Sequence, residues 1–506
     1  MNARTDLSGF PRDVARPARE RAASVHRLYC AYLHEPSLQH YCSDPPFDPP
    51  AAYPELPGSA TRQVDASNLV YPAVRQLLLK LGLDAANAGT ARWNPFGALI
   101  RPGDTVVIKP NLVTHHHYLG RDHLYSTVVH GSVLRPLLDY SLLALGDTGR
   151  VIIADNPVEG ADFAPLMEFT GIARMARVLR ARGYRQVEVL DLRPRVLCEA
   201  KDGSFLYRPQ PGDPLGYVQI DLGRDSLFAE LDGKPDLHYY TLADPAVDHV
   251  DPRYCGSSTT DRFHNATTHR YLVSRSVLAA DAVINVAKMK CHCKAGVSLC
   301  LKNMIGVVYE KHCMPHHRPG PPPLGDSFPH YPAAHYVLAR KAYVRLRRWL
   351  RIHRWPGFRR LRNGMQKKGI LVGQHIEHGN WKGNDTIWRT ILDLNRIVLY
   401  ADRQGVMRDS PQRRMFCLID GIISQQGDAP INGEAVPTGV LVGGFNPVLT
   451  DELALRLMGI ERNRIRTVDG ARDRFKWPLL CTSQRPIEPD SEEMPNLQFK
   501  LAKGWR

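Results

Sequence analysis

No stretch of this 506-residue chain approaches the roughly 18 consecutive apolar residues of a membrane-spanning helix, which excludes an integral membrane protein. Cysteine is scarce, with 10 in the chain, so a secreted disulfide scaffold is also excluded. The first 27 residues contain no apolar segment of the kind that a secretory signal needs. We therefore expect a cytoplasmic protein whose thiols stay reduced.

Acidic residues are missing from one segment. Residues 327–376 contain 12 Lys or Arg and no Asp or Glu, and without them the net charge of +15 falls to +3. Apolar side chains recur there at helical spacing over 335–355, with arginines around the rest of the circumference. This pattern predicts either a packed surface helix or a site for an acidic protein or an anionic membrane at 335–368. Nucleic acid is disfavoured as a partner because aromatic residues for base stacking are few.

Several standard motifs are absent. The chain has no GxGxxG, Walker A or GxSxG pattern, and it has no CxxC of the iron–sulfur or zinc type. What it does have is short β-branched strands that alternate with helical stretches, as in strand 105–109, helix 132–145, strand 150–154, helix 163–182 and strand 186–191. The alternation predicts an α/β fold of mostly parallel sheets flanked by helices.

Composition divides the chain into five segments. We expect a Pro-rich irregular extension at 1–66 and a C-terminal tail at 481–506. Between them we expect an α/β core in two parts, 67–310 and 381–480, separated by an inserted basic helical segment at 311–380. Residues 192–270 are rich in Asp, Gly and Pro and are expected to cover one end of the sheet as loops. Further α/β elements are expected at 282–286, 295–307, 386–400, 416–420, 439–443 and 451–458, with Thr450 as the last helix's N-cap.

The candidate site lies where predicted strands end. A strand ends near Val286, and lysines and a histidine follow it, before a predicted helix carries Lys302 and Asn303. Ligands of open α/β sheets bind at the carboxyl ends of strands. We expect His292, Lys302 and Lys290 to be catalytic. The predicted substrate-binding residues are Lys109, Asn111, Lys288, Asn303, Asn384 and Asp385.

Two alternatives concern these residues. Lys109 ends a buried strand, so it either binds substrate or pairs with a carboxylate such as Asp155 or Asp420. Cys291, Cys293 and His312 would supply soft ligands for a transition metal, although loop histidines with solvent or hydrogen-bonding roles explain the same pattern. The cofactor is otherwise unknown.

These motifs together resemble the domain-of-unknown-function 362 family. The matching segments are KPN at 109–111, the stretch at 281–292 that contains INVAKMKCH, and KN-x-x-G at 302–306. An Asp-Gly strand end at 420–421 and a helix ending in LMG at 451–459 also match. The resemblance covers roughly residues 67–310 and 381–460. Many relatives carry ferredoxin-type cysteine clusters that this chain lacks, and the family implies no settled reaction.

A second segment, His292-x-x-Ala295-Gly296-x-Ser298-x-x-x-Lys302, resembles the nickel-pincer lactate racemases. That likeness implies an acid/base role for His292 and a cofactor-anchoring role for Lys302. The chain departs from the racemase pattern at Leu299-Cys300, which replaces a glycine pair.

The sequence thus predicts an enzyme for a small anionic, carboxylate-type substrate, with isomerase- or oxidoreductase-type chemistry. Lysines would hold the anion, and His292 would be the general acid/base. Two alternatives stay open: a metal- or redox-cofactor-handling protein that uses the Cys/His cluster at 291–313, and a non-catalytic assembly factor that acts through the basic helix.

Overall fold

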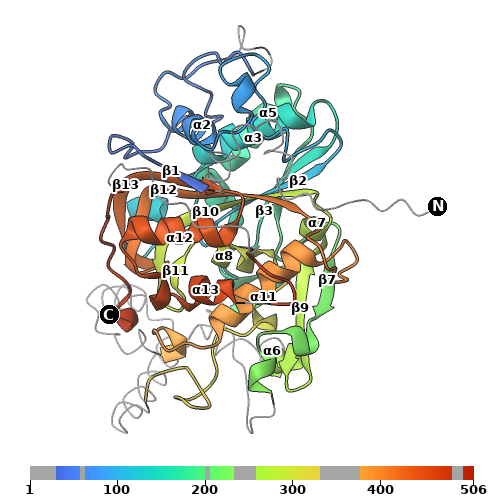
Figure 1. The fold of residues 1–506 in the computed structure, drawn as a ribbon, viewed down its shortest axis with the longest axis vertical. Helices are drawn as coiled ribbons and strands as arrows, with labels where there is room; N and C mark the ends of the chain where they lie inside the picture. The colour runs from blue at the N-terminus through green and yellow to red at the C-terminus, as the bar shows by residue number, and fades with distance from the viewer. Residues whose placement is uncertain are drawn as a thin grey trace, which may run out of the picture.

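The central feature of the computed structural model is an eight-stranded mixed sheet, which crosses the middle of Figure 1. The structure describes residues 30–56, 58, 63–199, 205–232, 258–330, 377–473, 475–480 and 494–506. The strand order is β1-β13-β12-β10-β2-β3-β4, and neighbours from β12 to β4 are parallel. This sheet confirms the predicted α/β class. Its strands are β1 (Cys30–His34), β2 (Thr105–Pro110), β3 (Arg150–Asp155), β4 (Val187–Asp191), β10 (Ala282–His292), β11 (Gly296–Ser298), β12 (Arg414–Asp428) and β13 (Asn432–Gly444).

Helices cover both faces of this sheet because its strands are apolar on both sides. In β2, Val106 and Ile108 belong to one buried cluster and Val107 to the other. Figure 1 shows α2, α3 and α5 above the sheet and α8, α11, α12 and α13 below it. The helices are α2 (Val70–Lys80), α3 (Gly131–Leu145), α4 (Phe163–Thr170), α5 (Ile172–Ala181), α6 (Ser258–Phe263), α7 (Arg275–Leu278), α8 (Cys300–Asn303), α11 (Ile387–Tyr400), α12 (Pro447–Met458) and α13 (Arg466–Asp469).

Three expectations need correction. The N-terminal extension is not wholly irregular, because β1 pairs antiparallel with β13 at the sheet edge. The helix expected over 163–182 is broken at Gly171, whose φ of 69° only glycine adopts readily. The N-cap of α12 is Asn446, whose side chain accepts from Val448 N and Leu449 N, and not Thr450.

The region expected to hold a helix over 295–307 folds differently. β10 does not end near Val286 but runs to His292, turns, and pairs antiparallel with β11. Lys302 then lies on α8, a single helical turn. Glycine at position 296 permits this hairpin, because Gly296 pairs with His292 and has a φ of 76°, a backbone conformation that glycine adopts readily.

The Asp/Gly/Pro-rich stretch forms two small sheets in its described parts. β5 (Arg195–Glu199) pairs with β6 (Phe205–Pro209), and β9 (Thr268–Ser274) pairs with β7 (Tyr217–Asp221) and β8 (His264–Asn265). The basic helix expected at 335–355 lies outside the described residues. None of the described helices combines the length and the apolarity that crossing a bilayer requires.

Candidate active site

Strand β10 delivers three polar side chains to one face. Side chains alternate along a strand, so Lys288, Lys290 and His292 share the side opposite the buried Met289 and Cys291. A β-bulge lies here, because Lys288 pairs with Asp420 of β12 whereas Lys290 pairs with Gln425. Bulges of this kind often lie beside active sites, where they redirect side chains.

Lys109, at the end of β2, is held by an ion pair. Its Nζ lies 2.7 Å from Asp155 Oδ1 and 3.0 Å from Asn303 Oδ1, with both charged side chains buried. Burial lowers the pKa of Lys109, and the Asp155 charge opposes that shift. Of the two roles considered for Lys109, the structure therefore shows the pairing with Asp155.

Asn303 and Asn111 connect Lys109, at the end of β2, with Lys290 on β10. Asn303 Nδ2 donates to Asn285 Oδ1 and to the carbonyl oxygens of Lys109 and Val286, at 2.8–3.2 Å. Asn111 Nδ2 donates to Asn303 Oδ1, and Asn111 Oδ1 accepts from Lys290 Nζ at 2.6 Å. These amides fix the spacing between α8 and the ends of β2 and β10.

Lys288 is fully buried in a second ion pair. Its Nζ lies 2.9 Å from Asp420 Oδ2 and also donates to the hydroxyl of Tyr41, which in turn donates to Asp420 Oδ1 at 2.8 Å. The Tyr41 ring is stacked on His130 at 4.8 Å between ring centroids. Tyr41 comes from the N-terminal extension, and sequence analysis missed it because nothing local marks it.

Lys290 has no carboxylate partner among the described residues. Its Nζ donates to Asn111 Oδ1 and to the carbonyl oxygen of Thr127, each at 2.6 Å. Burial, followed by the nearby charges of Lys302 and Lys288, holds the pKa of Lys290 well below its ordinary value. The amine is therefore poised to lose its proton far more readily than a surface lysine.

His292 is neutral and its tautomer is constrained. Burial and then the charges of Lys302 and Lys290 hold its pKa well below 6.5. Its Nδ1 accepts from the backbone N–H of Lys294 at 3.0 Å, so the proton of the neutral ring is assigned to Nε2. His292 thus presents an N–H donor, and proton acceptance would require the ring to leave that backbone contact.

Lys302 and Lys294 complete the group. Burial lowers the pKa of each to about 8, and the charge of Lys294 adds to the effect on Lys302. Lys294 is buried and donates to the His378 carbonyl oxygen, whereas Lys302 is partly exposed. Lys294 was not among the predicted site residues, and it lies in the turn between β10 and β11.

We call Lys109, Lys288, Lys290, His292, Lys294 and Lys302 the lysine cluster. Gly306 borders it, because a Cβ there would lie 2.1 Å from Asp155 Oδ1 and 2.6 Å from Lys109 Nζ. Of its five lysines, only Lys109 and Lys288 pair with a carboxylate in the described structure. The other three, Lys290, Lys294 and Lys302, have no carboxylate partner among the described residues.

Among the described contacts, no hydrogen bond or ion pair joins the side chain of Asn384 or Asp385 to the lysine cluster. Asn384 Nδ2 donates to the carbonyl oxygens of His316 and Gly379, and its Oδ1 caps the start of α11. Asp385 accepts from Trp388 Nε1 and lies among three arginines. Asn384 thus supports the loop whose His378 carbonyl oxygen accepts from Lys294, whereas Asp385 pairs with arginines near the start of α11.

The three predicted metal ligands are not brought together. Cys291 faces the opposite side of β10 from His292, with its Sγ on the Lys500 carbonyl oxygen. His312 lies 3.1 Å from Glu159 Oε2, in a separate contact. Within the described ranges, no three His, Cys, Asp or Glu side chains form a group able to hold a metal ion.

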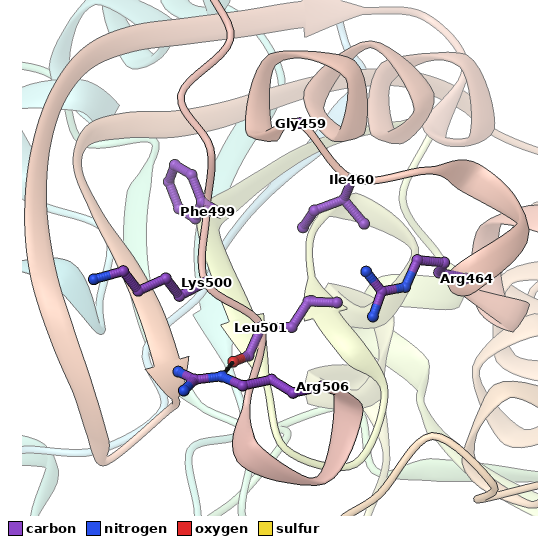
Figure 2. Close-up of a pocket in the computed structure, with 7 residues that line it drawn as sticks. All are labelled: Gly459, Ile460, Arg464, Phe499, Lys500, Leu501 and Arg506. Carbon is purple, nitrogen blue, oxygen red and sulfur yellow. Dashed lines mark hydrogen bonds between the residues drawn. The ribbon is translucent and has the colours of Figure 1, made fainter.

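A pocket beside the C-terminal segment is separate from the lysine cluster. Figure 2 shows its lining, Gly459, Ile460, Arg464, Phe499, Lys500, Leu501 and Arg506, none of which belongs to the cluster. Arg506 Nε donates to the Leu501 carbonyl oxygen, and Arg464 donates to that of Trp505. Arg464 therefore holds the C-terminal segment onto the fold, whereas the Arg506 contact lies within that segment.

Comparison with known proteins gives a family and no activity. The family described as "Domain of unknown function (DUF362)" matches residues 240–456, which confirms that resemblance over this part of the chain. No curated protein matches. A crystal structure of a protein from Thermotoga maritima is 12% identical with a TM-score of 0.31, over 76% of this chain and 58% of that one. This chain thus spans less than two thirds of that protein. The likeness to the lactate racemases stays a prediction.

Proposed function

Because residues 240–456 match a family of unknown function, we propose from the geometry of the site that the protein is an enzyme that binds a small carboxylate-bearing anion at the lysine cluster. The observation that carries the proposal is the surplus of amines over carboxylates. Lys290 and Lys294 are buried and Lys302 is partly exposed, and none of the three has a carboxylate partner among the described residues. Burying an ammonium group is costly unless an anion compensates it.

Each side chain has a distinct role in this proposal. Lys302 is the cluster's partly exposed amine, so it meets the carboxylate first. His292 donates its Nε2–H to a substrate oxygen, because Nδ1 is occupied by the Lys294 backbone. The general base would then be a lysine of lowered pKa, Lys290 or Lys302, and not His292 as first expected.

An isomerase- or oxidoreductase-type reaction fits this division of roles. A neutral amine removes a proton beside the carboxylate, while the remaining ammonium groups and the imidazole N–H stabilise the negative charge that develops. No described grouping of residues favours the metal-handling alternative. A cytoplasmic location and an acidic partner for 335–368 stay predictions from the sequence.

Anion-dependent stabilisation tests the proposal. Thermal unfolding is recorded with acetate, lactate, malate, citrate and phosphate, for wild type, Lys302→Gln and His292→Ala. Carboxylates are expected to raise the melting temperature of wild type and much less that of the variants, because the lost groups contact the anion. Lys476→Gln is the matched control, since Lys476 pairs with Asp225 at the surface. Equal carboxylate effects on wild type and Lys302→Gln would refute the site. Native mass spectrometry of the purified protein, which detects a retained small molecule, is the companion measurement.

A further inference from the structure

Lys302 differs from the other lysines of the cluster in having no hydrogen-bonding partner among the described residues. Lys109 and Lys288 are held by carboxylates, and Lys290 and Lys294 by backbone or amide oxygens. Its side chain is partly exposed, whereas the other four are buried. An amine that is reachable and not held by the fold is free to react with a ligand.

The surroundings of Lys302 favour its neutral, nucleophilic form. Lysines become nucleophilic when they are desolvated or lie beside other cations. Burial and the charges of Lys109 and Lys294 lower the pKa of Lys302 to about 8. At pH 7 about a tenth of this amine is neutral, against roughly one in 2,500 for an ordinary lysine.

We propose that Lys302 forms a covalent imine with the carbonyl group of a 2-oxo carboxylate bound in the lysine cluster. The inference deepens the proposed function, because it assigns the substrate class to carboxylates that also carry a carbonyl. Asn303, the residue after Lys302, is joined through Asn111 to Lys290, and His292 shares one face of β10 with Lys290. Lys302 therefore borders the group that would hold the carboxylate.

The chemistry balances without a further reactant. The neutral Lys302 nitrogen attacks the carbonyl carbon and a C–N bond forms; the carbonyl oxygen takes one proton and the nitrogen releases one, which gives a neutral carbinolamine. The hydroxyl oxygen then takes a second proton, the C–O bond breaks and water leaves, and the nitrogen releases its second proton to leave the imine. The His292 Nε2–H donates a hydrogen bond to the oxygen during attack, and the neighbouring ammonium of Lys294 supplies and regains the proton.

Reductive trapping tests the imine on the full chain. Protein is incubated with pyruvate at neutral pH and reduced with sodium borohydride, and intact mass and peptide mapping locate the adduct. One reduced adduct per chain is expected, on Lys302, and none on Lys302→Arg. Acetone, which has the ketone but no carboxylate, is expected to give at least tenfold less adduct, because it lacks the anion that the cluster holds.

The outcomes separate the imine from the anion site. Cooperative urea unfolding shows whether Lys302→Arg is folded, and Lys476→Gln, whose lysine pairs with Asp225 at the surface, is expected to give the same adduct as wild type. Absence of an adduct on wild type that acetate does stabilise would overturn the imine and leave the proposed function intact. An adduct that forms first on another lysine, such as Lys294 or the exposed Lys382, would also overturn it. Failure of both adduct and stabilisation would overturn both proposals.

Discussion

Asp420→Asn probes the buried electrostatics of the site most directly. The Lys288–Asp420 pair is 2.9 Å long, and both side chains are fully inaccessible to solvent. Removing one partner of such a pair typically destabilises a protein by about 3–5 kcal/mol, because the other charge stays buried. The amide would also place its N–H₂ group against a donor, either Lys288 Nζ or the backbone N–H of Ile422. The measurement is urea unfolding followed by tryptophan fluorescence.

The loss of folding stability in Asp420→Asn has an upper limit that can be calculated and that depends on pH. Lys288 can lose its proton instead of staying charged, and that costs about 5 kcal/mol at pH 7 but only about 2 kcal/mol at pH 9. Burial already lowers the pKa of Lys288 in the wild type, and the substitution lowers it further. The folded variant then binds fewer protons than its unfolded chain, so its stability rises with pH toward the ordinary lysine pKa. We therefore expect the deficit to narrow between pH 7 and pH 9.

Two controls complete this test. The double variant Lys288→Met/Asp420→Leu removes both charges and should recover most of the stability. Asp225→Asn breaks the exposed pair with Lys476 and should cost less than about 1 kcal/mol. The explanation is refuted if the free energy of unfolding of Asp420→Asn at pH 7 is less than about 1 kcal/mol below that of wild type. It is also refuted if the difference between the two proteins grows toward pH 9.

Further predictions concern charge and close packing. Carboxylate affinity, measured by isothermal titration calorimetry, should be retained below pH 8 and fall as pH rises through about 8, because Lys294 and Lys302 lose their protons there. The expected drop in affinity between pH 7 and pH 9 is about tenfold to hundredfold. An affinity that does not change with pH would contradict this prediction. Gly306→Ala should weaken both stability and carboxylate binding, because its Cβ would displace the Asp155–Lys109 pair, and unchanged values in the same assays would show that the backbone yields there at little cost.

Much of the fold could be predicted because it depends on local periodicity. Continuous β-branched runs predict strands at 105–109 and 150–154, and alternating valines predict one at 186–191; the structure places β2, β3 and β4 there within one residue. The break at Gly171 was not predictable in the same way. There a Cβ would lie 2.5 Å from Phe47 Cζ, a contact between segments more than a hundred residues apart.

What the sequence by itself determined is the alternation of Lys288, Lys290 and His292, because side-chain direction along a strand follows from its period of two. Tertiary structure alone decided which charges are compensated. In the tertiary structure Lys109 pairs with Asp155, whereas Lys302 has no partner among the described residues. The physical reason is that pairing and desolvation depend on register, bulges and hairpins, which bring distant segments together, and no local pattern encodes those distances.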